Sequence, residues 1–114
     1  MKDDILAHLH DILQTGRAIK TFISGKTFDK YISDDLLRSA VERKFEVMGE
    51  AINRLKRDAP ELLPQIRYNR DIISFRNILV HGYDAIDDRI VWGVIEEDLA
   101  SLIEDVDRLL AEPK

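Results

Sequence analysis

The sequence predicts an all-α protein in which four amphipathic helices form an antiparallel bundle. Apolar side chains recur at intervals of three and four residues along most of the 114-residue chain, and this spacing gives a helix one apolar face. No segment alternates polar and apolar residues over a useful length, as a half-buried strand would. The connecting segments are short, and a chain of this length is expected to form a single domain spanning residues 1–114.

The first helix is expected over residues 3–24. With Gly16 as the one interruption, its apolar face consists of Ile5, Leu9, Ile12, Ile19, Phe22 and Ile23. Gly25 is placed to end this helix, because glycine readily adopts the left-handed conformation that commonly follows a helix C-terminus. Residues 26–33 are expected to form a loop that two aromatic anchors, Phe28 and Tyr31, hold to the core.

The second helix is expected to begin at Ser33 or Asp34, whose side chains can accept hydrogen bonds from the free amides of a first helical turn. Pro60 requires this helix to end near Asp58, because a proline disfavours the helical conformation in the residue before it. Residues 60–64 then predict a short turn or a single helical turn. The apolar face of the second helix consists of Leu37, Val41, Phe45, Met48, Ile52 and Leu55.

Two further helices complete the predicted bundle. The third covers residues 69–81 and ends at Gly82, and its buried face consists of Ile72, Phe75 and Leu79. The fourth is expected as one helix from residue 87 to residue 111, capped by Asp84 or Asp87. Its apolar face consists of Val91, Ile95, Leu99, Leu102, Val106 and Leu109.

The composition excludes several functional classes. The chain contains no cysteine, which rules out disulfides, cysteine zinc sites, thiol nucleophiles and iron–sulfur clusters. A net charge of −5 argues against a protein that coats nucleic acid through general positive charge. The charge is unevenly spread, however: residues 1–83 carry 14 basic and 12 acidic side chains, whereas residues 84–114 carry 3 and 10. An anionic substrate would bind better to the middle of the chain, although a solvated bundle surface explains the same charges.

The N-terminal segment indicates neither secretion nor membrane insertion. The chain begins with two acidic residues among its first four, whereas a signal peptide needs a basic start followed by a long apolar run. Unbroken apolar stretches reach only three residues, as at 78–80, which is far too short to span a bilayer. A cytoplasmic protein is therefore expected.

A cluster of chemically versatile side chains lies in residues 76–83, RNILVHGY. At about 100° per residue, Arg76, Asn77 and His81 share one half of the third helix, as Tyr83 would if the helix continued past Gly82. Arginine can bind a phosphate through two hydrogen bonds, and histidine can transfer a proton near neutral pH. Such a set suits RNA cleavage, because RNA supplies its own nucleophile, the 2′-hydroxyl. The alternative is a surface arginine and a histidine that contacts the last carbonyls of its helix.

RNILVHGY resembles the signature of the HEPN-superfamily ribonucleases, specifically of the HepT-like toxins. In that signature an arginine is followed directly by a polar residue, here Asn77, then by a histidine and a tyrosine at the spacing of Arg76, His81 and Tyr83. Residues 46–51, EVMGEA, resemble the acidic Gly-Glu-Ala portion of the second long helix of the family. Val91-Trp92 resembles the pair that opens its last helix. The resemblance covers nearly the whole chain.

The resemblance implies a HEPN-like bundle that pairs into a homodimer, with the motifs of two protomers facing one cleft. It implies a metal-independent endoribonuclease that needs no cofactor and cleaves messenger or transfer RNA. Arg76 would hold the scissile phosphate, and His81 would act as general acid or base and leave a cyclic phosphate. Asn77 would orient this pair. Glu46 would either position Arg76 through a salt bridge or be an ordinary surface acid.

The resemblance also implies regulation by a second protein. The chain would be the toxin of a type VII-like toxin–antitoxin pair, and its antitoxin would be an MntA-type nucleotidyltransferase that attaches AMP to Tyr83. The added phosphate and nucleotide would exclude RNA from the cleft by bulk and by like charge. Two other functions stay open at this point. One is a non-catalytic helical partner or substrate-binding subunit of a nucleotidyltransferase, and the other is a plain dimeric interaction module, which the intact motif disfavours.

Other polar and aromatic residues have simpler interpretations. His8 and His10 lie about 200° apart on a helix, so one protomer cannot use both for one metal, and they are expected at the surface or in packing. Trp92 is expected to pack in the core, with base stacking as the alternative. Tyr31 and Tyr68 flank the basic middle of the chain and could stack on RNA bases.

Overall fold

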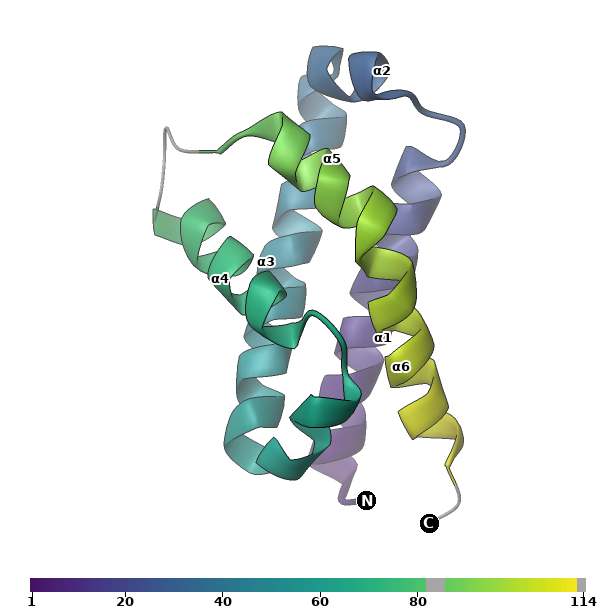
Figure 1. Ribbon diagram of the computed structural model, residues 1–114, viewed down its shortest axis with the longest axis vertical. Coiled ribbons are helices and arrows are strands. Elements are labelled where there is room, and N and C mark those ends of the chain that lie inside the picture. The colour runs from purple at the N-terminus through teal and green to yellow at the C-terminus, as the bar shows by residue number, and fades with distance from the viewer. Residues whose placement is uncertain (82–85, 113–114) are drawn as a thin grey trace.

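The computed structural model describes residues 1–81 and 86–112, and its regular elements are helices (Figure 1). None of the residues in these two ranges lies in a β-strand, so the all-α prediction is confirmed. Within the same ranges, no helix is both long and apolar enough to cross a membrane. The elements are α1 (Asp3–Ile23), α2 (Phe28–Ser33), α3 (Asp35–Asp58), the 3₁₀ helix η1 (Pro60–Gln65), α4 (Asn69–His81), α5 (Asp88–Glu97) and α6 (Leu99–Ala111).

The longest helices, α1 and α3, lie side by side and run in opposite directions (Figure 1). Helix α4 packs on α3, and α6 packs on α1, so each long helix is covered by a shorter one. The hydrophobic core lies between them, and every apolar-face residue predicted for the second, third and fourth helices is buried. The helix that carries the RNILVH segment is therefore held against α3 by its apolar face and presents its other side outward.

The ends of α1 and α3 follow their local signals. Gly25 has a φ of +73°, the left-handed conformation predicted for a residue that ends a helix. Asp34 caps α3, where its side chain accepts a hydrogen bond of 3.0 Å from the backbone N–H of Leu37. Helix α3 ends at Asp58, and Pro60 opens η1, both as predicted.

The loop predicted over residues 26–33 instead contains a short helix, α2. It is capped by Thr27, and six residues are too few to show a helical period in the sequence. Tyr31 is fully buried, with its ring centroid 5.3 Å from that of Trp92. Burial raises the pKa of the Tyr31 hydroxyl, and the carboxylates of Glu42 and Asp88 raise it further. Because Tyr31 is buried, the prediction that it could stack on RNA bases is wrong. Trp92 packs against the core as expected.

The prediction of one helix over residues 87–111 is also wrong. The helix breaks at Asp98, which has a φ of −107° and a ψ of −37°, and α5 and α6 follow different partners on its two sides. Helix α5 contacts α2, whereas α6 packs along α1. Asp87 caps α5, as predicted, by accepting a hydrogen bond of 2.9 Å from the N–H of Arg89. Packing against separate helices thus bends a segment whose periodicity is continuous.

The segment that leads into α4 is anchored by a buried carboxylate, Asp105. It accepts hydrogen bonds from the backbone N–H, Nε and Nη2 of Arg67 at 2.9, 3.0 and 3.0 Å, and one from Arg108 at 3.3 Å. The Asn69 side chain donates to the carbonyls of Leu63 and Ile66 at 3.0 and 2.7 Å. These bonds set the position at which α4 begins, and with it the position of the RNILVH segment.

Loss of this anchor is expected to make the fold less stable and less sensitive to acid. The hydrogen bonds from Arg67 lower the pKa of Asp105, so its contribution is complete above the ordinary aspartate pKa of about 4 and is lost as the pH falls below it. We expect Asp105→Asn to reduce the free energy of unfolding at pH 7 by roughly 1.5–3 kcal/mol. Urea unfolding from pH 7 to pH 3 measures both effects. An unchanged acid dependence in the variant would contradict this assignment.

Candidate active site

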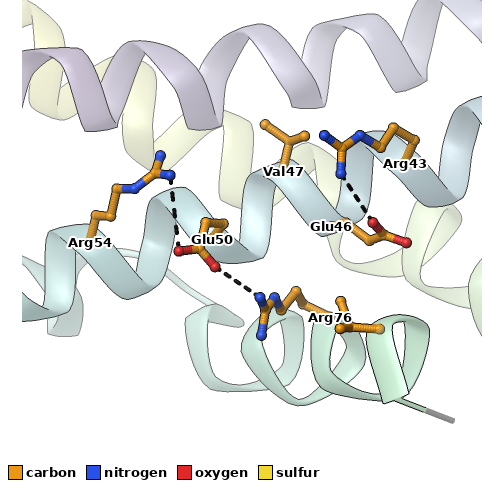
Figure 2. Close-up of a pocket in the computed structure, with 7 residues that line it drawn as sticks. Arg43, Glu46, Val47, Glu50, Arg54 and Arg76 are labelled. Carbon is orange, nitrogen blue, oxygen red and sulfur yellow. Dashed lines mark hydrogen bonds and ion pairs between the residues drawn. The ribbon is translucent and has the colours of Figure 1, made fainter.

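A groove with a volume of about 570 Å³ lies between α3 and α4 (Figure 2). Its α4 side is formed by Arg76 and Val80. Its α3 side is formed by residues at helical spacing, namely Arg43, Glu46, Val47, Glu50 and Arg54. With three guanidinium groups and two carboxylates along its walls, the groove has a small excess of positive charge that suits an anionic ligand.

The guanidinium of Arg76 is held in a fixed position at this groove. Its Nη2 donates to Glu50 at 3.0 Å, and its Nη1 donates to the side-chain oxygen of Asn77 at 3.1 Å. Each of these two nitrogens carries a second N–H, and the side chain is 23% exposed, so donors remain for an incoming anion. Two parallel N–H donors match the geometry of a phosphate. The remaining N–H groups of Arg76 can therefore donate hydrogen bonds to a phosphodiester.

Gly49 allows α4 to approach α3 closely enough for this contact. A Cβ placed on Gly49 would lie 2.4 Å from the Cβ and 2.7 Å from the Cγ of Arg76. No real Cβ sits that near another carbon, so a side chain at this position would push the two helices apart. The Gly-Glu pair in α3 thus provides both the space and the carboxylate for Arg76.

The structure brings Arg76 and Asn77 together and leaves His81 outside the groove. Asn77 and His81 are both exposed, and His81 is the last residue of α4. Within the described part of the chain, His81 makes no hydrogen bond or ion pair, so its imidazole is accessible. Tyr83 lies outside the described residues.

The acid that contacts Arg76 is Glu50, a residue given no role by the resemblance. Glu46, the acid named from the resemblance, pairs instead with Arg43 on its own helix at 3.2 Å. Figure 2 shows Glu50 between Arg76 and Arg54. The Nη2 of Arg54 lies 4.0 Å from a carboxylate oxygen of Glu50. The intervals of four, three and four residues that join Arg43, Val47, Glu50 and Arg54 place them on one face of α3. This helical spacing is the feature of the sequence from which the α3 wall of the groove could be predicted.

The remaining candidate residues lie elsewhere. His8 is buried and its Nε2 lies 2.8 Å from a carboxylate oxygen of Asp58, so it joins α1 to the end of α3, whereas His10 is exposed. Tyr68 is 38% exposed. Over residues 1–81 and 86–112, the histidine and acidic side chains form no group of three that could hold a metal ion.

Comparison with known proteins identifies relatives along almost the entire chain. The family model "Ribonuclease HepT-like" matches residues 12–109. A Thermococcus cleftensis protein named "Probable ribonuclease HepT" is 31% identical over 102 residues, which cover 90% of this chain and 92% of that protein. A Methanocaldococcus jannaschii protein named "Putative RNase" is 30% identical over 106 residues, or 93% and 96% of the two chains. No solved structure matches. The chain belongs to the HepT-like ribonuclease family.

Proposed function

We propose that the protein is a metal-independent endoribonuclease and the toxin of a type VII-like toxin–antitoxin pair. The observation that carries this proposal is the guanidinium of Arg76, held by Glu50 and Asn77 with unused donors, on a helix that ends in the exposed His81. The names of the relatives support RNA as the substrate. We further propose that the protein acts in the cytoplasm on messenger or transfer RNA, as a dimer of one-domain, HEPN-like four-helix bundles.

The reaction uses a nucleophile that belongs to RNA. His81 takes the proton from a ribose 2′-hydroxyl, and the 2′-oxygen attacks the adjacent phosphorus. Arg76 donates hydrogen bonds to the non-bridging oxygens and stabilises the charge that develops there. The bond from phosphorus to the 5′-oxygen breaks, and that oxygen takes up a proton from water. The products are a 2′,3′-cyclic phosphate and a 5′-hydroxyl, and neither a metal nor a protein nucleophile takes part.

Dimerisation would complete this site. His81 lies about 140° around α4 from Arg76, outside the groove that Arg76 lines. Two groups so placed on one helix approach the same phosphate poorly, whereas the His81 of a second protomer can face the groove of the first. Ile78 lies between Arg76 and His81 in the sequence of α4. It is 44% exposed and supplies apolar surface for such a contact. These features support a cleft formed by two copies of α4.

The antitoxin would act by modifying the end of this cleft. We propose that a nucleotidyltransferase attaches AMP to Tyr83, two residues beyond His81. The α-phosphate of ATP forms a bond to the phenolic oxygen, the bond to the leaving pyrophosphate breaks, and the phenolic proton is released. The added phosphate and adenosine would repel the RNA backbone and fill the space beside His81.

One expression experiment tests both parts of the proposed function. The chain is expressed alone and with a nucleotidyltransferase whose gene adjoins its own, and the purified protein is then incubated with RNA in excess EDTA. We expect growth arrest and cleavage to cyclic phosphate ends from the chain alone. Co-expression is expected to add the mass of AMP and to abolish cleavage. Tyr83→Phe should stay unmodified and toxic, whereas Tyr68→Phe, the matched control, should behave as wild type.

Two results would contradict the proposal. Cleavage that stops in EDTA, or products that end in a 3′-hydroxyl, would rule out the metal-independent reaction. A chain that is modified by the nucleotidyltransferase but cleaves no RNA would favour the non-catalytic partner of that enzyme.

A further inference from the structure

A second cavity, with a volume of about 450 Å³, lies where the end of α3 and η1 meet the first turns of α4. Lys56 enters it from α3, and Asn69 and Arg70 enter it from α4. The remaining wall is apolar and consists of Pro60, Leu63, Pro64 and Ile73. The cavity thus combines positive charge with an apolar wall.

The charges of this cavity are not neutralised by the described part of the chain. Lys56 and Arg70 are exposed, no acidic side chain lines the cavity, and neither cation forms an ion pair with an acid in residues 1–81 or 86–112. In the first groove, by contrast, every arginine has a glutamate within 4.0 Å. Of the two hollows, the second therefore presents the stronger net attraction for an anion.

The walls of the cavity are held rigidly. Asn69 donates its side-chain amide hydrogens to the carbonyls of Leu63 and Ile66, and Ile66 is buried. The chain between η1 and α4 is further tied to α6 through Arg67 and Asp105. The backbone of the site is therefore ordered before a ligand binds, and the conformational entropy lost on binding is mainly that of the exposed Lys56 and Arg70 side chains.

The cavity shares one side of α4 with Asn77 and His81, whereas Arg76 faces the first groove. At about 100° per residue, Arg70, Asn77 and His81 fall within roughly 40° of one another around the helix axis. All three side chains are exposed. The 11 residues from Arg70 to His81 correspond to about 16 Å along the axis. One extended strand can therefore contact both ends of this face.

We propose that this cavity is a second RNA subsite, which binds single-stranded RNA flanking the scissile phosphate. A backbone phosphate lies against Lys56 and Arg70, and a base or ribose packs on the apolar wall formed with Ile73. The inference rests on the proposed ribonuclease function and adds an affinity site to it. Because the site lies away from Arg76 and His81, it strengthens the binding of long RNA and leaves the chemical step unchanged.

The test compares two double variants of equal charge change in the full chain. Lys56→Gln/Arg70→Gln removes the cavity cations, and Lys26→Gln/Lys30→Gln removes two exposed cations, one just before α2 and one within it. Both are made on a His81→Ala background and titrated with labelled oligouridines of about 3 and about 12 nucleotides. We expect the cavity variant to bind the long oligomer roughly 10-fold more weakly than the control. We also expect a salt dependence shallower by about 0.7 per lost phosphate contact.

The loss should be smaller for the short oligomer, which gains less than the long one from contacting the catalytic residues and the cavity together. Equal affinity of the two double variants for the long oligomer would overturn the proposal. An equal loss for both oligomers would also overturn it, because it would indicate damage to the first groove. Unchanged RNA binding with weaker binding of the nucleotidyltransferase would assign the cavity to a protein partner instead. A wild-type chain that cleaves no RNA would refute the proposed function separately, since these titrations need no cleavage.

Discussion

Replacing His81 with alanine is expected to lower RNA cleavage by roughly 10²–10⁴-fold, the usual contribution of a positioned general acid or base. The side chain is exposed and forms no hydrogen bond or ion pair with the described residues, so the free energy of unfolding should change by less than about 0.5 kcal/mol. Single-turnover cleavage, with thermal unfolding on the same samples, measures the two quantities. His10→Ala, at an exposed position on α1, is the matched control.

The same assay distinguishes two roles for Arg76. Arg76→Ala is expected to reduce cleavage by roughly 10²–10³-fold, because the transition state loses its charged donors. Arg76→Lys keeps the charge but loses the two parallel donors, so it should recover only part of this loss. Arg17→Ala, which removes an exposed cation from α1, should cleave as wild type. Full activity in either His81→Ala or Arg76→Ala would exclude the proposed mechanism.

The fold is predictable wherever a local signal marks the end of a helix. Asp34, Pro60 and Gly25 act through their own backbone and side-chain chemistry, and α3 and η1 begin and α1 ends where these residues indicate. The break at Asp98 has no such signal. It depends on α5 contacting α2 while α6 packs on α1, which is a contact between segments far apart in the chain.

The candidate site likewise has one part that the local sequence predicts and another that depends on how the helices pack. The spacing of RNILVH is sufficient to place Arg76 and Asn77 side by side on one helix. The choice between Glu46 and Glu50 as the partner of Arg76 depends on which turn of α3 faces α4, and the period of a single helix does not determine this. Gly49 determines which turn of α3 faces Arg76, because α4 can approach α3 most closely at the position without a side chain.

The second large effect is expected at Gly49. Gly49→Ala places a Cβ 2.4 Å from the Cβ of Arg76, so α4 must move away from α3. We expect a loss of roughly 1–3 kcal/mol in the free energy of unfolding, together with weaker cleavage as Arg76 moves from Glu50. Urea unfolding and cleavage rates measure these changes. Gly93→Ala is the matched control, since nothing lies within 4 Å of its Cβ and alanine favours a helix by about 0.5–1 kcal/mol.

The two glycine substitutions should therefore change stability in opposite directions, although both replace a helical glycine with a better helix former. The loss of stability in Gly49→Ala comes from the clash with the Cβ and Cγ of Arg76, so it should depend on that side chain. In an Arg76→Gly background both atoms are absent, and Gly49→Ala should lose most of its cost. A cost that persists in this background would show that Gly49 serves α3 alone, and that the close approach of the helices does not position Arg76.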